Sequence, residues 1–229
     1  MNYFNFKNID SRNISGLIVQ ELPPITKPPM RVSLIEIDGR DGDLIEELGY
    51  QAYDKVIKIG LSRGYNINEI ISWLNGEGEL ILSNENDKYY KAKIINQIDF
   101  ERLVRFKTAN IKFHVQPYKY KIDENFIVVN QTVTNQGNIE SSPLIRLEKT
   151  NYNNVDITIN GINLKYNFNN ESYVEIDCEN KTVEYEGLNR NRKITIGYIF
   201  PRLSIGQNNI SFNSSNTCII KMKRKDRWL

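Results

Sequence analysis

The feature that most constrains the fold is a pair of alternating apolar and polar runs separated by an Asn-Gly dipeptide. Apolar side chains occupy every second position over residues 155–159 and again over residues 162–168, and Asn160-Gly161 lies between the two runs. A period of two places alternate side chains on one face of a strand, and Asn-Gly favours the type I′ turn of a two-residue hairpin. The sequence therefore predicts a β-hairpin with one buried face.

Short β-branched or alternating runs bounded by turn residues recur along the rest of the chain. The strands expected from them cover residues 32–37, 56–61, 79–83, 89–95, 109–116, 173–178, 182–185, 193–198, 209–212 and 217–222. A polar turn over residues 84–88 is expected to join the third and fourth of these strands. Pro117 is expected to end the strand 109–116, because proline cannot donate a hydrogen bond to a sheet.

One short α-helix is expected after Asn66. This residue is a good N-cap, and Glu69 follows it three positions later. Apolar residues at positions 67, 70, 71 and 74 recur at helical spacing, and Asn75-Gly76 ends the pattern. Trp73 lies one step off this apolar row, so it is either a core residue or an exposed contact residue.

The chain of 229 residues is long enough for one large or two small domains. Asn, Gln, Thr and Gly are frequent between residues 130 and 142, which places an expected domain boundary after residue 130. We therefore expect a mainly β protein. Residues 1–130 form a β-sandwich-like domain with the one short α-helix, and residues 131–229 form a galectin-like or jelly-roll β-sandwich.

Residues of the types that commonly act in catalysis or bind metals are few. His114 is the only histidine and lies on the polar side of an alternating strand, where a solvated or interface imidazole is far commoner than a catalytic one. Cys178 and Cys218 are too few for a disulfide framework or, with one histidine, for a tetrahedral zinc site, so we expect reduced core residues. The aspartates of residues 38–43 lack the distal glutamate of a calcium loop and are interpreted as a turn. We expect no enzyme, metal or cofactor.

The charge balance bears on whether the protein binds nucleic acid. Thirty Lys and Arg against 28 Asp and Glu leave a net charge of +2, which argues against a polybasic nucleic-acid binder. The strongest basic cluster, residues 221–229, could contact nucleic acid, anionic glycans or an acidic neighbour, or be a last strand with a solvated basic end. No stretch of 18 apolar residues and no secretory signal is present, so we expect no membrane association.

The order of several short motifs resembles that of phage distal tail proteins. These motifs are Phe4-Asn5-Phe6-Lys7-Asn8 with Asp10-Ser11, the loop Asp38-Gly39-Arg40-Asp41-Gly42, Ile71-Ser72-Trp73-Leu74, residues 87–92, the strand 111–113 with Pro117, Ile176-Asp177-Cys178, Phe200-Pro201, Gly206, Asn208 and Trp228. The resemblance covers nearly the whole chain. The proline-rich segment 22–29 departs from the family, which implies a local change in the strand or belt found there.

The resemblance implies a virion structural protein at the tail tip, assembled in the cytoplasm of a bacterial host. Such proteins form a homo-hexameric ring that joins the tail tube protein to the baseplate hub or tail-associated protein. The ring leaves a lumen through which DNA passes without sequence recognition. The interface candidates are Asp38, Gly39, Arg40, Asp41, Gly42, Trp73, Tyr89, Tyr90 and His114.

The residues alone leave a second interpretation open, a carbohydrate-binding β-sandwich module that contacts host-surface glycans. Aromatic side chains often line sugar sites, and Tyr173, Tyr185 and Tyr198 lie in predicted strands. Tyrosine is enriched at protein interfaces for the same amphipathic reason, so composition does not separate the two interpretations. A third, a hydrolase of cell-wall glycan, has only carboxylates of unknown position behind it.

Overall fold

The computed structural model describes residues 2–197, 199–215 and 217–229, and it divides the chain into two compact units. The N-terminal unit ends at Ile122, and the C-terminal unit covers Asp123–Trp228. This division comes earlier than the expected boundary after residue 130, because β10 (Ile127–Val129) pairs with β20 (Ile219–Lys223). Both units consist mainly of strands, so the mainly β fold class is confirmed.

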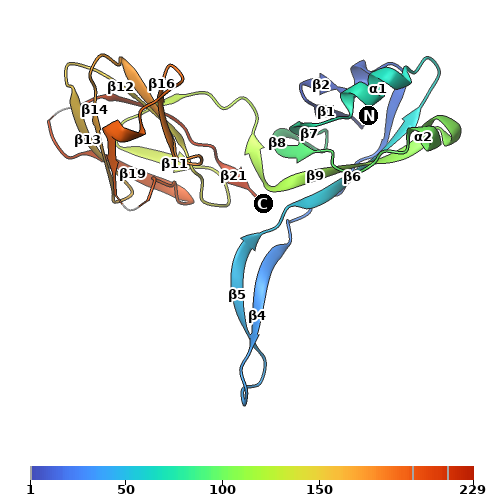
Figure 1. Ribbon diagram of the computed structural model, residues 1–229, viewed down its shortest axis with the longest axis horizontal. Helices are drawn as coiled ribbons and strands as arrows, with labels where there is room; N and C mark the ends of the chain where they lie inside the picture. Colours follow the sequence, from blue (N-terminus) through green and yellow to red (C-terminus); the bar gives the residue numbers. More distant parts are fainter. Residues whose placement is uncertain (1, 198, 216) are drawn as a thin grey trace. The chain divides into compact units, whose positions relative to one another are not determined.

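The N-terminal unit contains a sheet with the strand order β2-β1-β7-β8-β9-β6-β3 and a separate hairpin, β4-β5. Its elements, shown in Figure 1, are β1 (Phe4–Phe6), β2 (Ile9–Asp10), the 3-10 turn η1 (Ser11–Asn13), β3 (Leu17–Glu21), β4 (Met30–Glu36), β5 (Asp43–Tyr50), β6 (Tyr53–Leu61), α1 (Ile67–Trp73), β7 (Glu77–Leu82), β8 (Glu85–Lys93), α2 (Phe100–Phe106) and β9 (Thr108–Lys121).

The core of this unit follows from the period of two in β6 and β9. Ile57 of β6 lies opposite Ile111 of β9, and both side chains are completely buried. Val56, Lys58 and Lys112 alternate with them and are exposed. The same alternation in both strands gives the sheet one apolar face, and burial of that face against the helices stabilises the unit.

Helix α1 begins where the sequence predicts it. The Oδ1 atom of Asn66 accepts hydrogen bonds from the backbone N–H groups of Asn68 and Glu69, at 3.1 and 3.4 Å. These bonds satisfy two of the donors that the first turn leaves unpaired. Ile70 is completely buried, whereas Ile71 is exposed. The buried face of the helix therefore contains Ile70 and Trp73 and excludes Ile71, in contrast to the apolar pattern.

Two local predictions are wrong. Pro117 does not end its strand, and β9 continues to Lys121. The register of β9 against β8 shifts between Tyr90 and Ala92, across from the proline, and β6 pairs only with the part of β9 before it. Neither β6 nor β8 therefore requires an N–H group from Pro117. The turn between β7 and β8 is also shorter than expected, because β8 begins at Glu85.

A second helix, α2, precedes β9 and was not expected. The side chain of Asp99 caps it by accepting a hydrogen bond from the backbone N–H of Arg102 at 2.8 Å. Leu103 is completely buried, whereas Phe106 is 60% exposed. The helix has only one buried apolar residue, which is too little periodicity for a prediction from sequence.

The C-terminal unit has a six-stranded sheet, β10-β20-β12-β15-β16-β17, and a five-stranded sheet, β11-β19-β13-β14-β18. Its remaining elements are β11 (Thr132–Asn135), β12 (Leu144–Glu148), β13 (Asn154–Ile159), β14 (Ile162–Asn167), β15 (Tyr173–Asp177), β16 (Thr182–Tyr185), β17 (Leu188–Asn189), the 3-10 turn η2 (Asn191–Lys193), β18 (Ile194–Ile196), β19 (Gly206–Phe212) and β21 (Arg227–Trp228).

The predicted hairpin is β13-β14, and its geometry confirms the prediction. Ile159 lies opposite Ile162, and the two turn residues between them, Asn160 and Gly161, have φ values of 48° and 79°. Positive φ at both positions defines the type I′ turn. The alternating apolar residues of both sheets meet in one core, which makes this unit a β-sandwich.

Candidate assembly surface

The hairpin β4-β5 is the most unusual surface of the N-terminal unit, and we call residues 30–50 the arm. Its two strands pair with each other and with no other strand of the described residues. Figure 1 shows the arm standing apart from the sheet of its own unit. The predicted interface loop Asp38–Gly42 forms its tip, where Gly39 and Gly42 both have a φ of 77°. The glycines allow the turn, because other residues rarely adopt positive φ.

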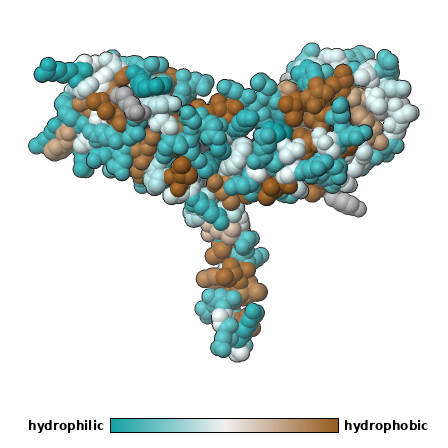
Figure 2. All heavy atoms as spheres, turned by 180° about the vertical axis from the view of Figure 1, so that it is seen from behind, coloured by the Kyte–Doolittle hydropathy of each residue, from teal (hydrophilic) through white to brown (hydrophobic). Residues whose placement is uncertain are grey.

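The arm exposes large apolar side chains. Leu34 and Ile45 lie opposite each other in the register and are 59% and 62% exposed. The other exposed apolar residues of the arm are Val32, Ile35, Ile37, Leu44 and Leu48, and Figure 2 shows hydrophobic residues on the arm between hydrophilic ones. Single exposed apolar residues are ordinary, but a contiguous group marks an interaction surface. A two-stranded hairpin is also barely stable alone in water.

The arm is acidic as well as apolar. It contains six Asp and Glu residues against two Arg, a formal charge of −4, whereas the whole chain has a charge of +2. Two of the carboxylates, Asp38 and Asp41, belong to the tip, and a third, Asp43, begins β5 directly after it. A partner for this surface must therefore offer apolar side chains together with cations.

The proline-rich segment 22–29 leads from β3 into the arm and is fastened to the sheet by its backbone carbonyl groups. Asn84 donates a hydrogen bond from Nδ2 to the carbonyl oxygen of Pro23 at 3.1 Å. Lys55 donates from Nζ to the carbonyl oxygen of Pro24, also at 3.1 Å. The backbone N–H of Gln51 donates to the carbonyl oxygen of Pro29 at 2.8 Å. These bonds fix both chain segments at the root of the arm.

A buried polar cluster lies beneath this root. Glu85 forms an ion pair with Lys119, 2.8 Å from Oε1 to Nζ, and accepts a hydrogen bond from the hydroxyl of Tyr90 at 2.6 Å. Lys55 is only 2% exposed, and burial lowers the pKa of its ammonium group while the charge of Glu85 opposes that shift. The Nζ atom of Lys55 also lies 4.9 Å from the ring centroid of Tyr90. Sequence analysis missed this cluster, although Lys55 is in phase with the buried Ile57.

The remaining interface candidates fall into two groups. Trp73 and Tyr90 lie in the core of the N-terminal unit. The indole of Trp73 stacks on Phe4 and donates from Nε1 to the carbonyl oxygen of Phe6 at 3.0 Å. Neither residue can face a partner while the unit is folded. Of the two interpretations of Trp73, its position therefore favours a core residue over an exposed contact residue.

His114 and Tyr89 are partly exposed. The Nδ1 atom of His114 lies 2.9 Å from Oδ1 of Asp54, and this contact is the main reason why the pKa of Asp54 is lowered. Tyr89 stacks on Tyr120 with 5.5 Å between ring centroids. Both residues are on the surface of the N-terminal unit, but the structure does not bring them together with the arm tip into one site.

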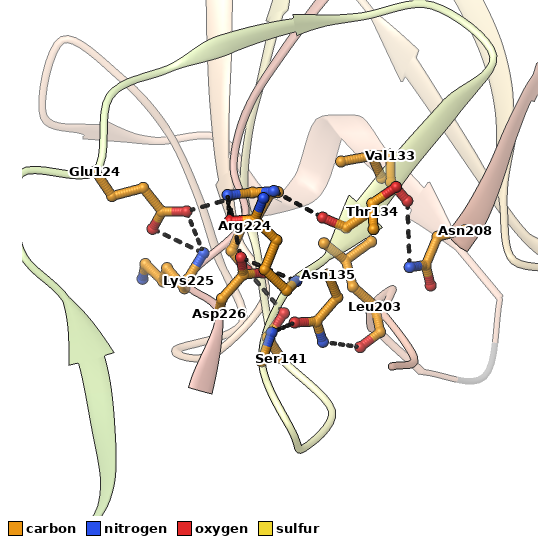
Figure 3. Close-up of polar contacts among 12 residues, drawn as sticks. Glu124, Val133, Thr134, Asn135, Ser141, Leu203, Asn208, Arg224, Lys225 and Asp226 are labelled. Atoms are coloured by element: carbon orange, nitrogen blue, oxygen red, sulfur yellow. Dashed lines mark hydrogen bonds and ion pairs between the residues drawn. The ribbon is translucent and has the colours of Figure 1, made fainter. Parts of the chain in front are cut away.

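The C-terminal unit has a polar network that joins residues near its two ends, shown in Figure 3. Arg224 donates from Nη1 to the carbonyl oxygen of Thr134 at 2.7 Å and forms an ion pair from Nη2 to Asp226 at 3.1 Å. The carboxylate of Glu124 accepts two hydrogen bonds from the backbone N–H of Lys225, at 3.0 and 2.8 Å. Burial raises the pKa of Glu124. The network holds Glu124 and Thr134 against the segment that joins β20 to β21.

The same contacts correct the interpretation of residues 221–229 as a solvated basic end. Lys221 forms an ion pair with Glu148 at 2.8 Å, and Lys225 forms one with Asp177 at 3.1 Å. Arg224 is held in the network described above. These cations neutralise carboxylates of their own unit, which leaves little free positive charge for nucleic acid or glycans.

Two of the three tyrosines considered for sugar binding meet on one sheet. Tyr173 and Tyr185 make an edge-to-face contact with 5.1 Å between ring centroids. The guanidinium of Arg146 lies 3.7 Å from the ring centroid of Tyr173, so it covers one face of that ring. Tyr198 lies outside the described residues. One of the two faces of the Tyr173 ring is therefore unavailable for stacking on a sugar.

Over the described ranges, no group of three or more His, Cys, Asp or Glu side chains is arranged to hold a metal ion. No helix in the described part of the chain has the length and apolar character needed to cross a membrane. Both cysteines are buried, and burial raises the pKa of each thiol to about 12.

Comparison with known proteins matches each of the two units to a family model of phage tail proteins. Residues 10–115 match the family model described as phage tail protein RIFT-related domain, and residues 136–228 match the model described as siphovirus-type tail component, C-terminal domain. Together these ranges cover most of the chain and define a phage tail component. The chain belongs to the siphovirus-type tail component family. No curated protein matches its sequence.

Solved structures with the same fold come from phage tails. The crystal structure of the Dit protein of phage SPP1, described as a paradigm of the hub adsorption apparatus in phages that infect Gram-positive bacteria, has a TM-score of 0.76 and 16% identity over 100% of both chains. Two structures of the phage P2 baseplate in its activated conformation, with Ca and with Sr, have TM-scores of 0.53 and 0.51. Their chains are 11% and 12% identical over 98% of both chains.

Proposed function

We propose that this tail component is a distal tail protein, six copies of which form a closed ring at the tip of a phage tail. The ring joins the tail tube protein to the baseplate hub or tail-associated protein and leaves a lumen for DNA during ejection. The family and the likeness to the Dit protein over the full length of both chains support the position in the tail. The role is structural and needs no catalytic residue, metal or cofactor.

The observation that carries the ring is the arm. It is a separate two-stranded sheet that exposes seven large apolar side chains. A protruding element that binds a different surface of an identical neighbour makes a heterologous contact, and such a contact generates a ring when its rotation closes. The tip residues Asp38–Gly42 are proposed as part of this contact.

Substitutions at one cross-strand pair of the arm test the proposal. We expect the wild-type chain to give six-membered rings in native mass spectrometry, and Leu34→Thr with Ile45→Thr to give mainly monomers. Threonine keeps the β-propensity of the strands and removes most of the apolar contact area. The matched control is Val128→Thr with Ile219→Thr, because both of these residues are exposed apolar strand residues of the other unit.

The control variant should assemble like the wild type, and circular dichroism should show the same strand content in all three proteins. Rings of the arm variant in the wild-type amount would remove the arm from the ring contact. A wild-type chain that stays monomeric at every concentration would refute the ring itself.

A further inference from the structure

The chain contains two Asn-Gly dipeptides, Asn75-Gly76 and Asn160-Gly161, and the structure places the two asparagine side chains in different surroundings. In such a dipeptide the backbone nitrogen of the second residue can attack the side-chain carbonyl carbon of the first, because glycine has no side chain to obstruct the approach. The attack expels ammonia and closes a succinimide ring. In a folded protein the rate of this reaction depends on how firmly the asparagine side chain is held.

The amide group of Asn160 is held at both of its polar atoms. Its Nδ2 atom donates hydrogen bonds to the carbonyl oxygen of Arg202 at 2.9 Å and to Oδ1 of Asn208 at 2.6 Å. Its Oδ1 atom accepts a hydrogen bond from the backbone N–H of Asn209 at 3.1 Å. These bonds must break before Cγ of Asn160 can turn towards the nitrogen of Gly161, and the type I′ turn also restricts the backbone there.

The side chain of Asn75 is not held in this way. Asn75 lies in the connection between α1 and β7, outside both elements, and it is exposed. Within the part of the chain that the structure describes, its side-chain amide has no hydrogen-bond partner. No bond therefore has to break before the side chain rotates towards the nitrogen of Gly76.

The ammonium group of Lys7 contacts the peptide group that would react. Its Nζ atom donates a hydrogen bond at 3.1 Å to the carbonyl oxygen of Asn75, which belongs to the same peptide group as the nitrogen of Gly76. When that nitrogen loses its proton, resonance spreads the negative charge onto the carbonyl oxygen. A cation that is already bonded to this oxygen stabilises the charge. The contact is therefore expected to make the Gly76 nitrogen easier to deprotonate.

We propose that Asn75 is a site of spontaneous deamidation assisted by Lys7, and that Asn160 stays intact while the chain is folded. The nitrogen of Gly76 gives its proton to the solvent and forms a bond to Cγ of Asn75. The bond from Cγ to Nδ2 breaks, and Nδ2 takes up a proton from the solvent and leaves as ammonia. Water then opens the succinimide ring. Cleavage of the new bond gives aspartate, and cleavage of the original peptide bond gives isoaspartate.

Both products place a new carboxylate near Lys7, and isoaspartate also inserts a carbon into the backbone between α1 and β7. The carbonyl oxygen of Gly76 accepts a hydrogen bond from the backbone N–H of Ile94 at 3.0 Å. An inserted backbone carbon would displace this carbonyl group, so the amide of Ile94 should exchange hydrogen faster in aged protein. The reaction takes place within one copy and does not require the ring.

Peptide mapping by mass spectrometry tests the site in the full chain, kept folded at mildly alkaline pH. We expect Asn75 to be converted at least about tenfold faster than Asn160, because the three hydrogen bonds of Asn160 oppose the reaction. In urea the two dipeptides should react at similar rates, since their surroundings no longer differ. Equal rates in the folded chain, or the same difference in urea as in the folded chain, would overturn the proposal.

Two variants separate the contribution of Lys7 from that of exposure. Lys7→Gln should slow the conversion of Asn75 about threefold, because it removes the charge from the hydrogen bond. The matched control, Lys58→Gln, removes a charge at an exposed position of β6 and should leave the rate unchanged. Enzymatic methylation of isoaspartate should label the aged wild type and not Asn75→Gln. Equal rates for Lys7→Gln and the wild type would refute the assistance by Lys7, and equal labelling of Asn75→Gln would refute the site.

Discussion

Replacing Glu85 by glutamine is expected to destabilise the N-terminal unit by about 3 kcal/mol. The carboxylate of Glu85 lies 2.8 Å from the ammonium of Lys119, and the two side chains are only 10% and 6% exposed. Removal of one partner from a buried ion pair costs about 3–5 kcal/mol, because the other charge stays buried without compensation. Glutamine still accepts the hydrogen bond of Tyr90, so we expect the lower end of this range.

Hydrogen exchange of the backbone amides in β8 and β9 measures this effect in the full chain. A loss of about 3 kcal/mol corresponds to an increase in exchange rate of about a hundredfold, because about 1.4 kcal/mol equals a factor of ten. The two units need not unfold together, and amides of the C-terminal unit should keep their wild-type rates. The arm root should exchange faster as well, because the cluster lies beneath it.

Glu77→Gln is the matched control, since Glu77 also forms an ion pair between neighbouring strands, 3.3 Å from Lys93. Those side chains are 76% and 56% exposed, and exposed pairs contribute about 0–1 kcal/mol. Equal exchange rates for the two variants would show that burial does not make the Glu85–Lys119 pair important, and the reasoning would fail.

Two further predictions concern the C-terminal unit. Burial raises the pKa of Glu171, but hydrogen bonds from Lys193, the backbone and Arg190 outweigh it and lower the pKa from 4.5 to about 2. A carboxyl group whose pKa is lower in the folded state than in the unfolded state stabilises the fold at pH values above its unfolded pKa. The free energy of unfolding should therefore decrease as the pH falls from about 4.5 towards 2. Glu171→Gln should lose this pH dependence. Gly161→Ala should cost about 1 kcal/mol in urea unfolding, because alanine disfavours a φ of 79° although its Cβ meets no atom within 4 Å. Gly197→Ala, where φ is not positive, should change stability by less than about 0.5 kcal/mol, and equal losses in the two variants would contradict the turn argument.

Much of the fold is predictable because it depends on local patterns. The β13-β14 hairpin combines a period of two with a dipeptide whose backbone preference specifies one turn, and both signals agree. Asn66 likewise predicts the start of α1. Pro117 was misleading, because its effect depends on whether a partner strand needs its N–H group, and that depends on the register between β8 and β9.

The candidate surface was only partly predictable. The tip Asp38–Gly42 is visible as a turn, but β5 was not expected, because residues 43–50 have no clean alternation and no buried face. Alternating sequence patterns indicate which side chains are buried, and almost no side chain of the arm is buried. Trp73 remained ambiguous because its burial depends on Phe4 and Phe6, residues far away in the chain that only the folded sheet brings next to it.

Electron microscopy of the purified wild-type chain tests most directly whether copies close around a channel. We predict closed particles with six-fold symmetry and a central opening. Monomers or open chains of copies at every protein concentration, with circular dichroism that shows a folded protein, would contradict the ring.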